Sequence, residues 1–120
     1  MNFGFDSANY KAESVSLTQL IGNPTMYHGE IVRVIGASLI EFESNSIWLT
    51  REHYKFRIYD NALSIEPDYK ALGVNANVLE MYNGKYVLME GIFNKDDRGH
   101  GSMFGGTLEK VTRFQLWEKE

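Results

Sequence analysis

The residues of this chain that could carry acid–base or metal chemistry are three histidines and one acidic pair. His28 stands beside a turn glycine, His53 lies in a basic stretch, and His100 closely follows Asp96 and Asp97 in a glycine-rich loop. No histidine pair has metal spacing such as H-E-x-x-H, and the acidic pair lacks the alternating oxygen ligands of a calcium loop. We therefore predict no metal site.

Motifs of covalent catalysis and cofactor binding are also missing. The chain has no cysteine, which excludes disulfides, thiolate metal sites and a cysteine nucleophile. It has no G-x-S-x-G, P-loop or dinucleotide fingerprint, because the glycines at positions 99–106 do not lead into a helix. The prediction is that the protein is not an enzyme and binds no cofactor.

A basic alternating stretch at positions 51–59 is a candidate nucleic-acid site. Basic side chains neutralise phosphates and aromatic rings stack on bases. The basic members of the stretch are Arg51, His53, Lys55 and Arg57. If the stretch is a strand, its apolar residues face the core and the basic ones become an ordinary solvated surface. The stretch could be strand or loop, and both interpretations stay open.

The charge balance favours a protein partner over nucleic acid. Twelve Lys and Arg against sixteen Asp and Glu give a formal charge of -4, which repels polyanions as a whole. Small, acidic, cysteine-free domains without catalytic motifs resemble bacterial immunity proteins, which bind a toxic nuclease and often present carboxylates to its basic cleft. The candidate contacts in the first hairpin and the last long loop are Glu41, Glu43, Asp96, Asp97, Met103 and Phe104.

The chain length of 120 residues corresponds to one domain, which buries roughly two-thirds of its unfolded surface. Residues 1–13 have no clear period and are predicted to be a flexible arm, followed by a single domain at 14–120. No apolar run approaches the roughly 18 residues of a membrane span, and no export signal is recognisable. We expect a cytoplasmic protein.

Local signals predict a short helix followed by strands. Ser16 and Gln19 fit a capping box, and Gly22 with Pro24 ends the helix after barely two turns. A long β-prone run at 30–42 should bend at Gly36, and a turn at 44–46 should lead into a return strand from position 47. Further strands are expected at 61–65, 85–93 and 107–117, with a partly helical connection at 68–79 and an exposed loop at 94–102.

The frame Y-x-G-x-x-V-x-x-x-G occurs twice, beginning at Tyr27 and Tyr82. Because the segments that follow the two copies do not resemble each other, a tandem repeat is disfavoured. Each copy combines a turn glycine, an apolar strand and a second glycine where the strand must curl, as a small barrel requires of several strands. Five such strands with a helical connection after the third predict an all-β fold with minor α content. The predicted architecture is an OB-like five-stranded Greek-key barrel with a short N-terminal helix.

The run at 16–24, the turn at 27–29 and the strand at 32–36 look like the opening of small bacterial OB-like proteins. Residues 83–91 and 106–108 are similar to the later strands of that family. The resemblance implies an OB fold and brings no catalytic residue, because the family is largely uncharacterised. The helix, N-P and Y-x-G pattern also occurs in tRNA-anticodon-like OB domains, which suggests nucleic acid.

Two functions follow as hypotheses. The first is a non-enzymatic inhibitor that neutralises a cognate toxin, such as a nuclease, by covering its active cleft. The alternative is a single-stranded nucleic-acid-binding OB protein that uses the basic stretch at 51–57.

Overall fold

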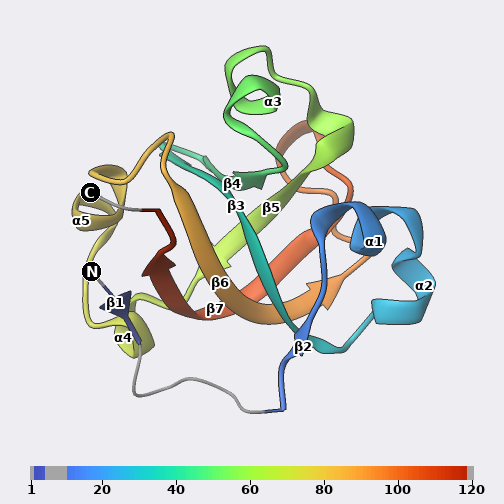
Figure 1. The fold of residues 1–120 in the computed structure, drawn as a ribbon, viewed down its shortest axis with the longest axis horizontal. Coiled ribbons are helices and arrows are strands. Elements are labelled where there is room, and N and C mark those ends of the chain that lie inside the picture. The colour runs from blue at the N-terminus through green and yellow to red at the C-terminus, as the bar shows by residue number, and fades with distance from the viewer. Residues whose placement is uncertain (1, 5–10, 119–120) are drawn as a thin grey trace.

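A β-barrel is the main feature of the computed structural model, which describes residues 2–4 and 11–118. Within these residues five strands form the barrel: β3 (Ile31–Glu41), β4 (Ser44–Trp48), β5 (Ala62–Pro67), β6 (Tyr86–Asn94) and β7 (Thr107–Leu116). They pair in the order β3-β4-β5-β7-β6 and β6 returns to β3, so the barrel is closed (Figure 1). Among the pairs of these five described barrel strands, β5–β7 is parallel and the others are antiparallel. The predicted OB-like barrel is therefore confirmed.

The two copies of the repeated frame lie on β3 and β6, which pair with each other. Their contacts are symmetric, because the Gly29 N–H donates to the Phe93 carbonyl and the Gly84 N–H to the Ser38 carbonyl, both at 2.8 Å. Both turn glycines have a φ of +82°, a left-handed conformation that glycine adopts without strain. The repeat therefore meets one geometric demand on two paired strands.

Short helices cover the barrel on two sides (Figure 1). Helices α1 (Leu17–Gly22) and α2 (Pro24–Tyr27) lie on the right in that view, and α4 (Tyr69–Leu72) and α5 (Ala76–Glu80) on the left. Both groups place buried leucines in the same apolar core as the strands. The connection at 68–79 is partly helical, as the sequence predicted.

The start of α1 has the predicted capping box. The Ser16 hydroxyl accepts a hydrogen bond from the Gln19 N–H at 3.1 Å, and the Gln19 side-chain oxygen accepts from the Ser16 N–H at 3.0 Å. These bonds satisfy two backbone donors that the first helical turn leaves free. Leu17 and Leu20 are buried in the core beneath this cap.

The N-terminal segment touches the barrel at two places. Strand β1 (Asn2–Phe3) pairs with β7, and β2 (Glu13–Ser14) pairs in parallel with β3. Residues 1 and 5–10 of the expected arm lie outside the described residues, and the division into arm and domain stays a prediction. None of the described helices is long and apolar enough to cross a membrane.

Two local predictions were wrong. The first turn is at positions 42–43 rather than 44–46, because Glu43 takes a left-handed φ of 68° and the residues that follow it already pair with β3. The stretch at 51–59, predicted to be strand or loop, begins instead with the helix α3 (Arg51–Lys55). The single turn η2 (Tyr59–Asn61) follows it. The Thr50 hydroxyl caps α3 by accepting from the His53 N–H at 3.2 Å.

Candidate functional site

The outer face of β4 and β5, which OB domains use to bind oligonucleotides and oligosaccharides, is filled here by the protein's own aromatic rings. Trp48 lies at the centre of this aromatic cluster and is only 1% exposed. Its ring centroid lies 5.2 Å from that of Tyr59, 5.9 Å from Phe104 and 6.4 Å from Tyr54. Trp48 and Phe104 are therefore buried in this cluster, where neither ring is open for a base or sugar to stack on it.

Two connections supply the covering rings. Tyr54 and Tyr59 come from the segment between β4 and β5, and Phe104 comes from the loop between β6 and β7. The Phe104 N–H donates to the Arg98 carbonyl at 3.0 Å, and the Arg98 Nε donates back to the Phe104 carbonyl at 2.8 Å. These reciprocal bonds hold the loop in a shape that directs Phe104 into the cluster.

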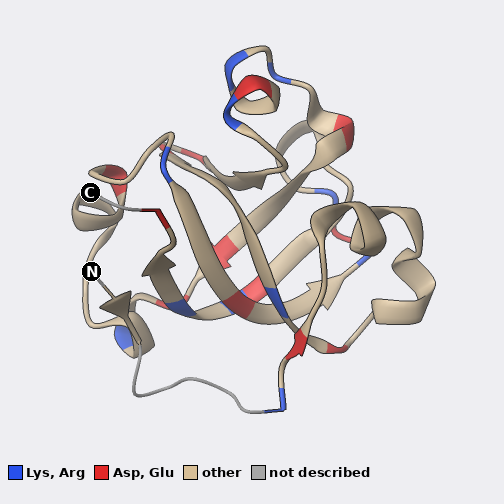
Figure 2. Ribbon diagram, in the orientation of Figure 1, with Lys and Arg blue, Asp and Glu red and all other residues tan. Residues whose placement is uncertain are grey.

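The basic residues at 51–57 do not form one continuous strip. The guanidinium of Arg51 binds Glu118 and donates from Nε to the Gly84 carbonyl, and His53 Nδ1 lies 2.7 Å from the Thr50 hydroxyl. Arg57 lies 3.6 Å from Glu41. Figure 2 shows blue Lys and Arg positions around α3, in a segment that also carries red acidic ones.

In a strand the apolar residues of the same stretch would have faced the core, but the stretch is not a strand and two of them are exposed. Phe56 is 66% exposed and Ile58 is 43% exposed. Lys55 extends over the exposed ring, with its Nζ 5.7 Å from the Phe56 centroid. Phe56 is the C-cap of α3 and Ile58 precedes η2, so the period of two that a strand would impose does not apply to either position.

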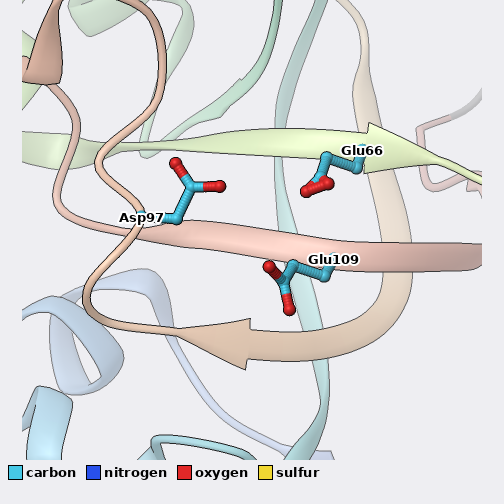
Figure 3. Close-up of side chains that lie close together, drawn as sticks. All are labelled: Glu66, Asp97 and Glu109. Atoms are coloured by element: carbon cyan, nitrogen blue, oxygen red, sulfur yellow. The ribbon is translucent and has the colours of Figure 1, made fainter.

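Below the aromatic cluster, the same side of the barrel carries three clustered carboxylates. Glu66 on β5, Glu109 on β7 and Asp97 in the loop direct their oxygens toward one another (Figure 3), all within 4.8 Å. Burial and the neighbouring charges of Glu109 and Asp97 raise the pKa of Glu66. Asn94 Nδ2 donates to Glu109 at 3.1 Å and the Gly99 N–H donates to Asp97 at 3.0 Å, but among the described residues no cationic group forms an ion pair with the carboxylate cluster.

The carboxylate cluster includes one predicted contact, Asp97, and two residues that the sequence analysis missed. Glu66 follows the core residue Ile65, and Glu109 follows Leu108, so strand alternation alone places both outward. Their proximity depends on the parallel pairing that sets Ile65 opposite Leu108. Three oxygen ligands suit a hard cation such as Ca²⁺ or Mg²⁺, although exposed acidic groups are common without one.

The other predicted partner contacts are dispersed. Glu41 is paired with Arg57, Glu43 lies exposed in the first turn, and Asp96 binds Lys95 at 2.7 Å. The hydrogen bond from Lys95 is the main reason that the pKa of Asp96 is lowered. Met103 is 42% exposed and stays a candidate contact.

Phe104 was predicted to be a partner contact, but its side chain is buried. It is 1% exposed, because the bonds between Arg98 and Phe104 turn its ring onto Trp48. Its structural role is to hold the loop between β6 and β7 on the barrel.

Comparison with known proteins gives similarity of fold only. No protein-family model and no curated protein matches the chain. A DUF3299 family protein from Pseudomonas aeruginosa has a TM-score of 0.51 at 12% identity, and the match covers 79% of this chain and 66% of that one, just under two thirds.

Two structures of asparaginyl-tRNA synthetase from Pyrococcus horikoshii, one complexed with asparaginyl-adenylate, also match. They have TM-scores of 0.46 and 0.45 at 16% and 17% identity. Each match covers 79% of this chain but only 20% and 21% of the synthetase chains. None of the three matches supports the resemblance to immunity proteins. The chain is an OB-like barrel that resembles a DUF3299 family protein in fold.

Proposed function

We propose that this protein is a non-enzymatic binding module that recognises a basic surface of another protein through the carboxylate cluster Glu66, Asp97 and Glu109. The observation that carries the proposal is the state of the face used by OB domains: its upper part is filled by Trp48 and its neighbours, and its open part is acidic. Such a face repels phosphates and attracts Lys or Arg side chains.

An incoming ammonium or guanidinium group would relieve the repulsion within the carboxylate cluster. Partial desolvation and, after it, the charges of Glu109 and Asp97 raise the pKa of Glu66, as such repulsion requires. With a partner that has a basic cleft, such as a nuclease toxin, this contact would speed association and fix the orientation of the two proteins. The finer proposal is therefore that the protein neutralises a cognate toxin by covering that cleft.

The test needs a variant of the site and a variant of equal charge elsewhere. The site variant carries Glu66→Gln, Asp97→Asn and Glu109→Gln, and the control variant carries Glu13→Gln, Glu52→Gln and Glu80→Gln at three exposed positions. The wild-type protein is first used to isolate a partner from the source cells. Kinetics of the purified complex are then measured for all three proteins at two salt concentrations.

The expected result is that the site variant loses at least about tenfold in affinity, mainly through a slower and less salt-dependent association. The control variant should change affinity much less. It has the same net charge as the site variant, but its carboxylate cluster is intact. Equal losses in the two variants would show that only net charge matters. A partner that is a nucleic acid would overturn the proposal.

Single-stranded nucleic acid is a second candidate ligand because of one observation at α3. The exposed Phe56 ring next to Lys55 is a stacking surface beside a phosphate-binding cation. Fluorescence anisotropy with labelled single-stranded DNA and RNA at low and moderate salt tests this site. Micromolar binding that weakens with salt and is lost in Lys55→Gln and Phe56→Ala would favour it. Absence of binding at low salt would exclude it.

A further inference from the structure

A pocket of about 540 Å³ lies on another part of the surface, between the N-terminal helices and the loop that joins β6 to β7. Pro24 and Thr25 of α2, Asp60 of η2 and Arg98 of the loop are among the residues that line it. Its volume falls within the range of small-molecule sites. In OB folds, the loop between the fourth and fifth barrel strands is one of the ligand-binding loops, and here that loop forms one wall. We call this the loop pocket.

The wall that the loop contributes is held in place before any ligand arrives. The Gly105 N–H donates to the Ala62 carbonyl at 3.0 Å, and the Thr107 hydroxyl donates to the Asp97 carbonyl at 2.7 Å. The Lys95 N–H donates to His28 Nδ1 at 3.1 Å, which ties the start of the loop to the turn before β3. A fixed site loses less entropy on binding than a mobile one.

The approach of the loop to α1 depends on the absence of a side chain at Gly105. A Cβ at that position would lie 3.1 Å from the Ile21 Cγ1, closer than most carbon contacts. Ile21 and Pro24 therefore form the apolar part of the loop pocket directly beside its polar residues. The pocket thus combines hydrocarbon surface with charged groups.

The charges of the loop pocket are partly compensated and partly free. Lys95 and Asp96 pair with each other at 2.7 Å. Arg98 uses Nε for the Phe104 carbonyl, while its two terminal nitrogens and the Asp60 carboxylate have no partner within the part of the chain that the structure describes. One free cation and one free anion, carried by different elements, thus line the same pocket.

We propose that the loop pocket binds a small zwitterion, namely an amino acid or dipeptide with an apolar side chain. The guanidinium of Arg98 receives the carboxylate through its two terminal nitrogens, and the carboxylate of Asp60 receives the ammonium group. The apolar side chain packs against Ile21 and Pro24, and the hydroxyl of Thr25 is a further hydrogen-bonding group. This inference is independent of the carboxylate cluster and of the partner proposed there.

The ligand test uses a set of compounds that differ in one charge. Leucine and the dipeptide leucyl-leucine carry both charges, leucinamide carries only the ammonium, and N-acetyl-leucine carries only the carboxylate. Each is titrated into ¹⁵N-labelled full-length protein up to about 10 mM, which detects millimolar dissociation constants. We expect the zwitterions to shift the amides of Ile21, Thr25, Arg98 and Gly105, and the singly charged compounds to bind at least about tenfold more weakly.

Variants then assign the charges. Asp60→Asn should weaken zwitterion binding about tenfold and leave the affinity for N-acetyl-leucine unchanged. Arg98→Gln should also weaken zwitterion binding about tenfold, but it should leave the affinity for leucinamide unchanged. Matched controls are Glu80→Gln and Lys85→Gln, two exposed charges outside the pocket. Because Arg98→Gln also removes a bond to the loop, Asp60→Asn is the decisive variant.

Failure is defined by three results. If neither zwitterion shifts the pocket amides, the proposal is wrong. If all four compounds shift them equally, the pocket recognises only the hydrocarbon part. If Asp60→Asn binds leucine like the wild type, then Asp60 does not hold the ammonium and the assigned chemistry fails. The partner-binding test at the carboxylate cluster is unaffected by each of these outcomes.

Discussion

Gly36 on β3 lies directly opposite Val87 on β6, and the same pairing sets Val32 opposite Gly91. Each valine of the repeated frame thus faces the curl glycine of the other copy. Both valines are fully buried, and both glycines have backbone atoms of a neighbouring strand pressed against them. The repeated frame is the sequence signature of a pair of strands that bend around the same core.

Replacement of either curl glycine should therefore destabilise the barrel. A Cβ at Gly36 would lie 2.5 Å from the Trp48 carbonyl oxygen, and one at Gly91 would lie 2.7 Å from the Glu109 carbonyl oxygen. We expect Gly36→Ala and Gly91→Ala to cost about 1–3 kcal/mol each in urea unfolding. Gly22→Ala is the control, because a Cβ there meets nothing within 4 Å. A neutral result at Gly36 would contradict the tight fit.

Removal of Glu90 should destabilise the fold much more than removal of an exposed carboxylate. It is 1% exposed on the outer side of β6 and accepts from Arg33 Nε at 2.7 Å and Arg113 Nη1 at 2.9 Å. Glu90→Ala would leave two guanidinium groups close together without their shared carboxylate, which should cost about 3–5 kcal/mol. Denaturant titration followed by circular dichroism measures this loss.

The exposed pair of Glu41 with Arg57 provides the contrast. Both side chains are more than 40% exposed and their separation is 3.6 Å. Glu41→Gln should therefore cost less than about 1 kcal/mol. If the two substitutions had similar effects, burial would not be what gives the Glu90 contacts their weight.

Glu66 should make the protein less stable at neutral pH than at mildly acidic pH. Its pKa is raised in the folded state, chiefly by burial and then by Glu109 and Asp97. Below its unfolded pKa the group is neutral in both states and costs nothing; as pH rises through the folded pKa, the charged form becomes unfavourable in the fold. Because Glu66 is exposed and solvent screens its charge, Glu66→Gln should stabilise only slightly at pH 7, by less than about 1 kcal/mol.

The same substitution should have no effect near pH 3, since Glu66 is then protonated in folded and unfolded chains alike. Thermal unfolding across this pH range, with Glu13→Gln as an exposed control, checks the sign. A stabilisation that persists at low pH would point to packing rather than charge as its cause.

Phe104→Ala should open the aromatic cluster. The ring is 1% exposed and makes edge contacts with Trp48 and Tyr59 at 5.9 and 5.1 Å. Its removal should cost about 3–5 kcal/mol and admit water to the indole. Trp117→Phe leaves Trp48 as the single tryptophan, so a red shift of its emission reports the opening.

A surface ring of the same type serves as the comparison. Phe56 is 66% exposed, and Phe56→Ala should change stability by less than about 0.5 kcal/mol without a spectral shift. An unchanged Trp48 emission in Phe104→Ala would mean that other side chains close the face.

Much of the barrel could be predicted because its signals are local. The capping box joins residues three positions apart, the turn glycines act on their own backbone, and the largely apolar run at 85–93 needs no knowledge of the partner strand. These features, together with the helical connection at 68–79, were enough to predict an OB-like barrel. Local rules failed at 51–55, where a period of two in the residue types coincided with a capped helix that packs Tyr54 on Trp48.

The functional surfaces, in contrast, were decided by tertiary structure. From the sequence, Phe104 is only a loop residue. In the structure, reciprocal hydrogen bonds with Arg98 direct its ring into the aromatic cluster. The sequence shows Glu66 and Glu109 only as two separate outward-facing residues. The parallel pairing of β5 with β7 brings them side by side. The sequence by itself determined the barrel, since backbone geometry depends on near neighbours. Which charges and rings meet on its surface depends on strands far apart in the chain, and only the closed fold decided that.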